Sequence, residues 1–433
     1  MPPVQGLQWI PFPPPPELYQ GPLPSPLTLA HGDPSYAFEL LDLLEPTYVM
    51  KKHGYLTQQL TDAELDEKRR CRYCNLTVAQ LTKHLQRTLD HRHAHPIPSP
   101  PCQAYRPLPS MQTPLGNGYY DVHLCMVPCN FHPGSVNGAT KCYDCCGQHV
   151  SESKPCATSE QHVLREYEAG KLHRMYQFHP TPPIYHESKE NRHIRQAVAI
   201  DCEMGTAETG ESELIRLSAI DYFTGEVLIN NLVKTDQPLR HLNTRYSGVT
   251  WGQLNHALRN KRTLIGKAGA RDALWRFVGP QTVIVGHGVN NDLRALRWIH
   301  TCVVDSYMVE HKIVQARKAF EAATEANMAM TTQQATQQLS VLAPPPATGH
   351  KTGSLTPHGQ APTTGLGEPK KQKKPKGCGD LALKTLLKKY LDRDIQMQGN
   401  KGHDSLEDAV AARDLVHWMV MRRLQQTYDG TMN

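Results

Sequence analysis

The segment that most constrains the fold is QAVAIDCEMGT, residues 196–206, where a short apolar run ends in two carboxylates one residue apart. If the run is a β-strand, the alternation of side chains places Asp201 and Glu203 on the same face. Two carboxylates directed at one point repel each other unless a cation neutralises them. The segment therefore predicts a strand whose end holds a divalent metal ion.

Further strands and helices follow this strand in the order of an α/β domain. Residues 214–234 predict two strands joined by a turn at Thr224-Gly225, which extend the sheet as a meander. Residues 282–285 predict a strand, followed by a glycine turn and an amphipathic helix with Asp292 in its first turn. His287 lies in that turn, where it either approaches a substrate or only shapes the turn. Residues 302–304 predict one more strand.

A final long helix is predicted within GHDSLEDAVAARDLVHWMVMRRL. Asp404 or Ser405 can cap its start, so His403 lies on the preceding loop and Asp408 projects from the first turns. A loop histidine beside a helix-borne carboxylate suits a general base close to metal ligands.

Together these motifs resemble the DEDD exonucleases that carry a catalytic histidine. The resemblance rests on Asp201-x-Glu203, His287-x4-Asp292 and His403-x4-Asp408 in this order. Within that superfamily, AIDCEMG, TRYSGVTWGQL, GHGVNNDLRALRWIH and GHDSLEDAVAARDLV are most similar to the eukaryotic RNA exonuclease branch. The resemblance covers about residues 195–310 and 377–425. It implies an α/β, ribonuclease H-like mixed sheet flanked by helices.

The resemblance also implies a mechanism and its site residues. Two Mg²⁺ or Mn²⁺ ions about 3.5 to 4 Å apart would be held by Asp201, Glu203, Asp292 and Asp408, and His403 would take the proton of the attacking water. The expected reaction is 3′→5′ removal of nucleoside 5′-monophosphates from RNA with a free 3′ end. Two alternatives stay open: an exonuclease that also acts on DNA, and an RNA-binding adaptor whose nuclease domain is only a scaffold.

Cysteine and histidine residues cluster upstream of these motifs. The chain has 12 cysteines, and without a secretion signal their clustering favours Zn²⁺ over disulfides. A zinc-finger-like segment at 65–98 offers Cys71, Cys74, His84 and His91, with His93 or His95 as alternatives to His91. A second module at 120–165 offers more ligands than one ion needs, and whether Cys145 or Cys146 points inward stays open. Its candidates are Cys129, His132, Cys145, Cys146, Cys156 and His162.

The remaining segments are predicted to carry little fixed structure. Residues 1–60 are Pro-rich, with one apolar patch, Tyr36–Leu44, that could form a short helix. Residues 311–376 have the composition of a disordered insertion in which only the part to about Met330 could continue as a helix. The insertion ends in a Lys-rich run at 370–376, which is either a nucleic-acid or nuclear-targeting segment or a solvated linker. No run of about 18 apolar residues predicts a membrane span. We expect a protein of the nucleus, the nucleolus included, or of the cytoplasm. The formal charge of +6 is too small for 433 residues to indicate a polyanionic partner.

Overall fold

The computed structural model describes residues 34–94, 128–151, 154–183, 193–341, 379–397 and 402–431. Side chains are described in these ranges except at 88–94, 329–341 and 428–431. Several sequence predictions lie outside the described residues, namely those for residues 1–33, His95 and the Lys-rich run at 370–376, and so do the side chains of His91 and His93.

Within the described residues the centre of the fold is a seven-stranded mixed sheet with the order β11-β9-β4-β5-β6-β8, in which β7 also pairs with β4. β4, β5 and β6 are antiparallel neighbours, whereas β9 runs parallel to both β4 and β11. The predicted mixed sheet flanked by helices is confirmed. Its strands are β4 (Ala197–Ala207), β5 (Ser212–Asp221), β6 (Val227–Lys234), β7 (Leu239–His241), β8 (Thr263–Ile265), β9 (Val283–Gly286) and β11 (Val303–Asp305).

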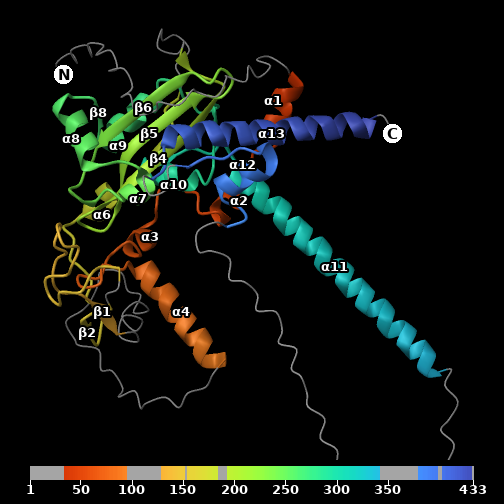
Figure 1. Cartoon of the computed structure of the whole chain (residues 1–433), viewed down its shortest axis with the longest axis horizontal. Helices are drawn as coiled ribbons and strands as arrows, with labels where there is room; N and C mark the ends of the chain where they lie inside the picture. Colours follow the sequence, from red (N-terminus) through yellow and green to blue (C-terminus); the bar gives the residue numbers. More distant parts are fainter. Residues whose placement is uncertain are drawn as a thin grey trace, which may run out of the picture.

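Helices cover both faces of the sheet, which explains why the central strand is apolar at nearly every position before its carboxylates. Ala197 and Ala199 pack against helices α1, α12 and α13, while Val198 and Ile200 face α9 and α10 on the other side. In Figure 1, α13 lies across the sheet and α10 lies below it. The helices are α1 (Pro34–Leu41), α9 (Gly266–Leu274), α10 (Asn290–Ala295), α12 (Leu383–Leu391) and α13 (Ser405–Thr431).

A smaller group of elements covers the end of the sheet near the carboxylates. α7 (Thr244–Ser247) follows β7, and α8 (Trp251–Arg259) begins with a capping box in which Thr250 and Gln253 satisfy each other's backbone amides. The apolar side of α8 packs on β5 and β6 through Leu254 and Ala257.

Residues 34–60 belong to the folded body. The short helix predicted from the apolar patch Tyr36–Leu44 is present as α1, whereas the prediction of a largely disordered Pro-rich segment over residues 1–60 was wrong for residues 34–60. Tyr36 of α1 is buried and its hydroxyl lies 2.7 Å from that of Tyr222 and 3.0 Å from Nδ1 of His417. After α2 (Thr47–Lys52), the buried Tyr55 contacts Asp305. The segment is too short for a core of its own, and these partners are far away in the sequence.

The region after β11 differs from the prediction only in part. Residues 306–341 form one continuous helix, α11 (Ser306–Val341), which agrees with the helix predicted as possible to about Met330 and extends beyond it into residues expected to be disordered. α11 projects away from the rest of the fold in Figure 1, and its side chains are mostly exposed beyond Lys312. Alanine, glutamine, glutamate and methionine are good helix formers, so local propensity sustains this helix without a buried face. Residues 342–376 of the predicted insertion lie outside the described residues.

A lobe formed before residue 183 holds the cysteine-rich segments and contacts the sheet domain beside α10. It contains α3 (Asp62–Asp66), α4 (Val78–Ala94), β1 (Cys129–Phe131), β2 (Ala157–Ser159), α6 (Lys171–Met175) and β3 (His179–Pro180). β1 and β2 are antiparallel, and β3 pairs in parallel with β10 (Trp298–Ile299), which follows α10. Leu65, Tyr176 and Phe178 form a small apolar core beneath this junction.

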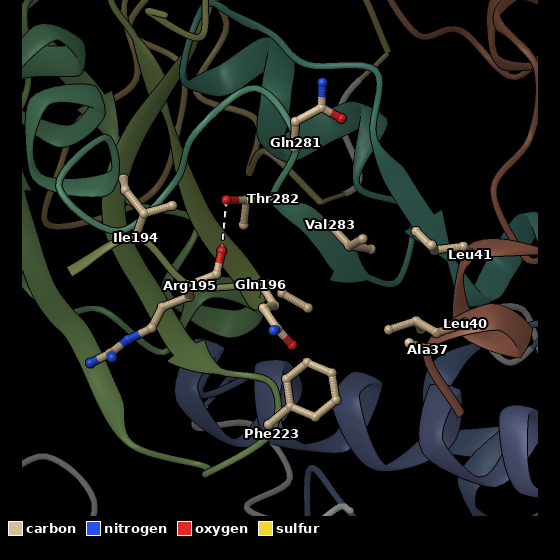
Figure 2. A pocket seen from close by; sticks show the side chains of 11 residues that line it. Ala37, Leu40, Leu41, Ile194, Arg195, Gln196, Phe223, Gln281, Thr282 and Val283 are labelled. Carbon is tan, nitrogen blue, oxygen red and sulfur yellow. Dashed lines mark hydrogen bonds between the residues drawn. The ribbon is translucent and has the colours of Figure 1, made fainter. Parts of the chain in front are cut away.

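One cavity of about 420 Å³ lies between α1 and the first residues of β4 and β9 (Figure 2). It is lined mainly by apolar side chains such as Leu40, Phe223 and Val283, and the guanidinium of Arg195 is paired with Asp221 and Glu226. Asp201 and Glu203 lie in the middle of β4 and are not among the residues that line this cavity. This cavity is therefore not the candidate active site.

Candidate active site and metal centres

Three predicted metal ligands meet where β4 passes beneath α13. One carboxylate oxygen from each of Asp201, Glu203 and Asp408 lies within 4.8 Å of the others. Asp201 and Glu203 share the face of β4 that α13 covers, because they continue the alternation of Ala197 and Ala199. The strand and the first turns of the helix thus converge on one point, as the sequence motifs predict.

The fourth predicted ligand approaches from the other side of β4. Asp292 lies in the first turn of α10, and its Oδ1 accepts a hydrogen bond of 2.9 Å from the backbone N–H of Cys202. Cys202 lies between Asp201 and Glu203 in the chain, so this bond fixes Asp292 against the same stretch of strand. Asp292 is not in the three-carboxylate group, but it contributes negative potential at Asp201.

Burial and mutual repulsion make the ionised state of these carboxylates costly in the absence of a cation. Burial, followed by repulsion from Asp292, Asp408 and Glu203, raises the pKa of Asp201 well above its ordinary value. Burial also raises the pKa of Glu203 to about 9 and that of Asp292 to about 8. The buried Oε1 of Glu203 has no hydrogen-bond partner among the described residues. A group of buried carboxylate oxygens with an unused acceptor fits a hard divalent cation such as Mg²⁺ or Mn²⁺.

His403 lies at the exposed side of this group. Its Nδ1 is 3.3 Å from Oδ2 of Asp408, and this interaction, the largest influence on the ring, raises the pKa of His403. The imidazole is 43% exposed, so it can reach a molecule that enters from solvent. The backbone fixes the loop, because the N–H of His403 donates to the carbonyl of Tyr246 at 2.7 Å.

The glycine before His403 is required by a close backbone approach. Gly402 has φ of +86°, and a Cβ atom at this position would lie 2.2 Å from the backbone nitrogen of Gly248. Only glycine allows the loop to pass so close to the end of α7. The TRYSGV segment, whose role the sequence left undefined, thus forms the seat of the histidine loop.

The structure also places supporting residues around the site that the sequence did not reveal. Arg216 of β5 lies opposite Glu203 and donates a hydrogen bond of 3.0 Å to the carboxylate of Asp404. Asp404 in turn caps α13, because its carboxylate accepts from the backbone N–H of Leu406. The side-chain amide of Gln396 donates to both oxygens of Asp408, at 3.0 and 3.2 Å. No local pattern marks these residues, since only the fold brings them to the carboxylates.

The turn that precedes α10 is held by Asp305. Its carboxylate accepts from the backbone N–H groups of Gly288 and Val289, at 2.8 and 3.2 Å, and from the hydroxyl of Tyr55 at 2.5 Å. His287 points to the hydroxyl of Ser306, with Nδ1 and Oγ 2.9 Å apart. In this structure His287 therefore shapes the turn, which was one of its two predicted roles.

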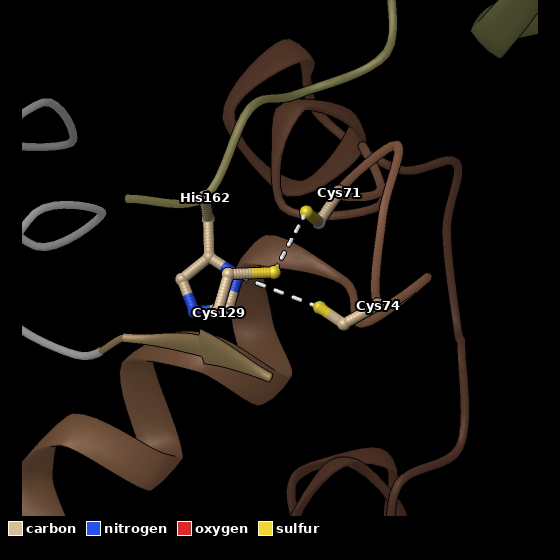
Figure 3. A group of neighbouring side chains, drawn as sticks. All are labelled: Cys71, Cys74, Cys129 and His162. Carbon is tan, nitrogen blue, oxygen red and sulfur yellow. Dashed lines mark hydrogen bonds between the residues drawn. The ribbon is translucent and has the colours of Figure 1, made fainter. Parts of the chain in front are cut away.

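The cysteine and histidine residues of the lobe form two compact groups. In the first group, Cys71, Cys74, Cys129 and His162 converge from four points of the chain (Figure 3). The Sγ atoms of Cys71 and Cys129 are 3.7 Å apart, and Sγ of Cys74 is 3.4 Å from Nδ1 of His162. A tetrahedral zinc ion with bonds of about 2.3 Å to sulfur and about 2.0 Å to nitrogen separates its ligands by about 3.5 to 3.8 Å. The spacing fits zinc.

The second group contains His132, Cys145, Cys146 and Cys156. Nδ1 of His132 lies 3.7 Å from Sγ of Cys145 and 3.5 Å from Sγ of Cys146, and Sγ of Cys156 lies 3.5 Å from that of Cys145. Both members of the Cys145-Cys146 pair therefore belong to the group, although the sequence suggested a choice between them. The described cysteines are free thiols, so the disulfide alternative finds no support there.

The grouping corrects the two ligand sets expected from the sequence. Cys129 and His162 join Cys71 and Cys74, whereas His84 is exposed on α4 and is not in the group; the side chain of His91 lies outside the described residues. A backbone hydrogen bond explains why His162 lies beside Cys71 and Cys74. The N–H of Arg72 donates to the carbonyl of Val163 at 2.7 Å, which brings His162 next to the Cys71 turn.

Comparison with known proteins places this site in context. The fold is a mixed α/β sheet, and its site places three carboxylates that can hold a divalent cation beside an exposed histidine. No family model matches the chain. It is 28% identical to RNA exonuclease 3 of Emericella nidulans over 321 residues, which cover 66% of this chain and 40% of that protein. It is also 28% identical to RNA exonuclease 3 of Candida albicans, over 70% of this chain and 57% of the relative.

Two further similarities are more limited. A segment of 114 residues, 26% of the chain, is 38% identical to small RNA degrading nuclease 3 of Arabidopsis thaliana and covers 14% of that protein. The catalytic unit of Neurospora crassa Pan2 is a structural neighbour with a TM-score of 0.34 and 17% identity, over 59% of this chain and 33% of that one. The sequence relatives confirm the predicted resemblance to eukaryotic RNA exonucleases, although the chain spans only about half the length of the first two.

Proposed function

We propose that this chain is a metal-dependent 3′→5′ exoribonuclease that releases nucleoside 5′-monophosphates from a free 3′ end. The observation that carries the proposal is the convergence of Asp201, Glu203 and Asp408 beside His403, with Asp292 bonded to the strand between the first two. The names of the sequence relatives support RNA as the substrate class. Processing of RNA 3′ ends is the biological role that we expect.

In this proposal each side chain has a separate task. Asp201, Glu203 and Asp408 bind divalent cations, and Asp292 holds the adjacent strand and contributes to the same site. Bound Mg²⁺ or Mn²⁺ supplies Lewis-acid chemistry for phosphodiester hydrolysis. His403 accepts a proton at its exposed face, and its contact with Asp408 stabilises the protonated ring.

Release of mononucleotides from a 3′-labelled oligoribonucleotide tests the proposal. With Mg²⁺ or Mn²⁺, we expect wild-type activity to be lost in Asp201→Asn and Asp292→Asn, and His403→Ala to bind metal but to cleave about 10² to 10⁴ times more slowly. Glu208→Gln is a matched control, because Glu208 is an exposed carboxylate just beyond the end of the same strand. Equal rates in all four variants would refute the assignment.

The same assay separates the alternatives. Tight RNA binding without any release under Mg²⁺ and Mn²⁺ would favour the adaptor function. Matched RNA and DNA oligomers, each with a free or a blocked 3′ end, would establish sugar preference and end dependence.

We further propose that the lobe binds two structural Zn²⁺ ions, one in each group of three thiols and one imidazole. The two ligand sets are joined by the β1–β2 ribbon: Cys129 and His162 belong to the first group, while His132 and Cys156 belong to the second. Zinc content of the purified protein tests this. We expect two zinc ions per wild-type chain and one zinc ion per chain in Cys71→Ser or in Cys146→Ser. Cys302→Ser is the control and should keep two zinc ions, because Cys302 lies outside both groups. Full zinc content in all variants would contradict the assignment.

The cellular location is also a proposal. The Lys-rich run at 370–376 would direct the chain to the nucleus, and attachment of this run to a fluorescent reporter would test it. Among the described residues, no helix has the length and apolar character needed to cross a membrane.

A further inference from the structure

A second cavity, of about 340 Å³, lies between the zinc lobe and the sheet domain, close to the candidate active site. The lobe contributes Lys68, Arg70 and Tyr176 to its lining, and the sheet domain contributes Met204, Arg294 and Arg297. These residues combine an apolar surface with four cationic side chains. Glu211 is the one carboxylate among the lining residues.

Two residues that line the cavity, Met204 and Asn291, are adjacent in the chain to the candidate metal ligands Glu203 and Asp292. Met204 follows Glu203 directly in β4 and lines the cavity, where it packs against the apolar cluster on the α9 and α10 side of the sheet. On α10, Asn291 and Arg294 face the cavity, whereas Asp292 points toward β4.

The cations of the cavity are only partly neutralised by the protein. Arg70 pairs with Glu211 at 2.6 Å, and Arg297 donates to the carbonyl of Met175 and stacks on Tyr176 at 4.7 Å. Arg294 donates only to backbone oxygen, that of Gly54. The Lys68 ammonium has no ion pair within the described part of the chain.

Lys68, Arg70, Arg294 and Arg297 line one half-buried cavity, and such a grouping of cations favours an anionic ligand. Burial, followed by the charge of Arg294, lowers the pKa of Lys68. Cations held together in a half-buried site are stabilised when an anion such as a phosphate joins them.

We propose that this cavity binds the backbone phosphates of the single-stranded RNA upstream of the scissile phosphate. The inference rests on the proposed function, and it assigns the zinc lobe a direct part in substrate binding. Lys68 and Arg70 immediately precede Cys71, so the first metal group fixes the segment that carries two of the four cations. Phosphate contacts of this kind give affinity and position without reading sequence.

Lys68→Gln is the informative variant, because its ammonium has no ion pair to lose. Lys68→Arg keeps the charge, and Lys318→Gln on the exposed part of α11 is a matched control that removes one surface cation elsewhere. Binding is measured in the Asp201→Asn background by fluorescence anisotropy with a labelled oligoribonucleotide of about twelve nucleotides over a series of salt concentrations. Zinc content and thermal melting of each variant confirm that the lobe is folded.

We expect Lys68→Gln to weaken binding about three- to tenfold at low salt and to reduce the slope of log Kd against log salt by about 0.7. Lys68→Arg and Lys318→Gln should bind as the parent does. With the active enzyme, Lys68→Gln should lower kcat/KM for the long oligonucleotide but leave cleavage of a dinucleotide unchanged.

The outcomes separate this inference from the proposed function. If RNA is cleaved but Lys68→Gln behaves like Lys318→Gln in binding and kinetics, the phosphate site is refuted and the exonuclease assignment stands. If no substrate is cleaved but Lys68→Gln alone changes the salt slope, the phosphate site is supported and the exonuclease assignment fails.

Discussion

Glu203→Gln should make the metal-free protein more stable while it removes activity. At neutral pH the buried carboxyl of Glu203 is held in its protonated form, because its pKa is raised to about 9 from an ordinary value of 4.5. In the unfolded chain the same group is ionised. Each pH unit between the ordinary pKa and pH 7 costs folding about 1.4 kcal/mol, so the penalty at pH 7 is about 3 kcal/mol. The glutamine amide has the same shape and no such penalty.

The sign of the pH dependence follows from the same shift. A carboxyl with a raised pKa in the folded state makes its full contribution to stability below pH 4.5, and this contribution is lost as the pH rises toward 9. Wild-type stability in buffer without Mg²⁺ or Mn²⁺ should therefore fall across this window. The fall should be smaller in Glu203→Gln.

Urea unfolding followed by circular dichroism measures this effect. The buffer should lack Mg²⁺ and Mn²⁺ but contain no chelator, so that zinc stays bound. Added Mg²⁺ should stabilise the wild type and leave Glu203→Gln nearly unchanged. Glu213→Gln, on the neighbouring strand, is the control with the opposite sign, since Glu213 pairs with Lys267 at 2.5 Å and its loss should destabilise the fold. A Glu203→Gln protein that is less stable than the wild type at pH 7, with an unchanged pH profile, would refute the reasoning.

Three further substitutions test how the fold positions the site. Gly402→Ala should displace the His403 loop from Gly248 and lower kcat strongly with a modest change in melting temperature; unchanged kcat would show that the loop tolerates the shift. Tyr55→Phe removes a hydrogen bond to the carboxylate of Asp305 and should lower the free energy of unfolding in urea by about 2 kcal/mol. It should also reduce kcat/KM, because the turn before α10 loosens. Wild-type values in both assays would contradict this prediction. Tyr36→Phe should cost about 1 kcal/mol through lost contacts between α1 and α13 but leave kcat unchanged, which separates a structural role from a catalytic one.

Much of the active site was predictable because its residues sit in local patterns of fixed geometry. Asp201 and Glu203 lie on one strand face because of the two-residue period, and Asp404 caps the helix that carries Asp408. The zinc ligands were predicted by type but not by grouping. Local spacing pairs Cys71 and Cys74 with histidines on the next helix, whereas the folded chain supplies Cys129 and His162.

The sequence by itself predicted the main strands and helices of the sheet domain and the candidate site residues by type, since these depend on side-chain chemistry and periodicity. Only the tertiary structure decided which cysteines lie in one group, that residues 34–60 belong to the core, and that Arg216, Gln396 and Tyr55 support the candidate site. It also brought Lys68 next to Arg294. The physical reason is that these contacts join residues far apart in the chain, and no local pattern records a pairing that forms only when distant segments pack together.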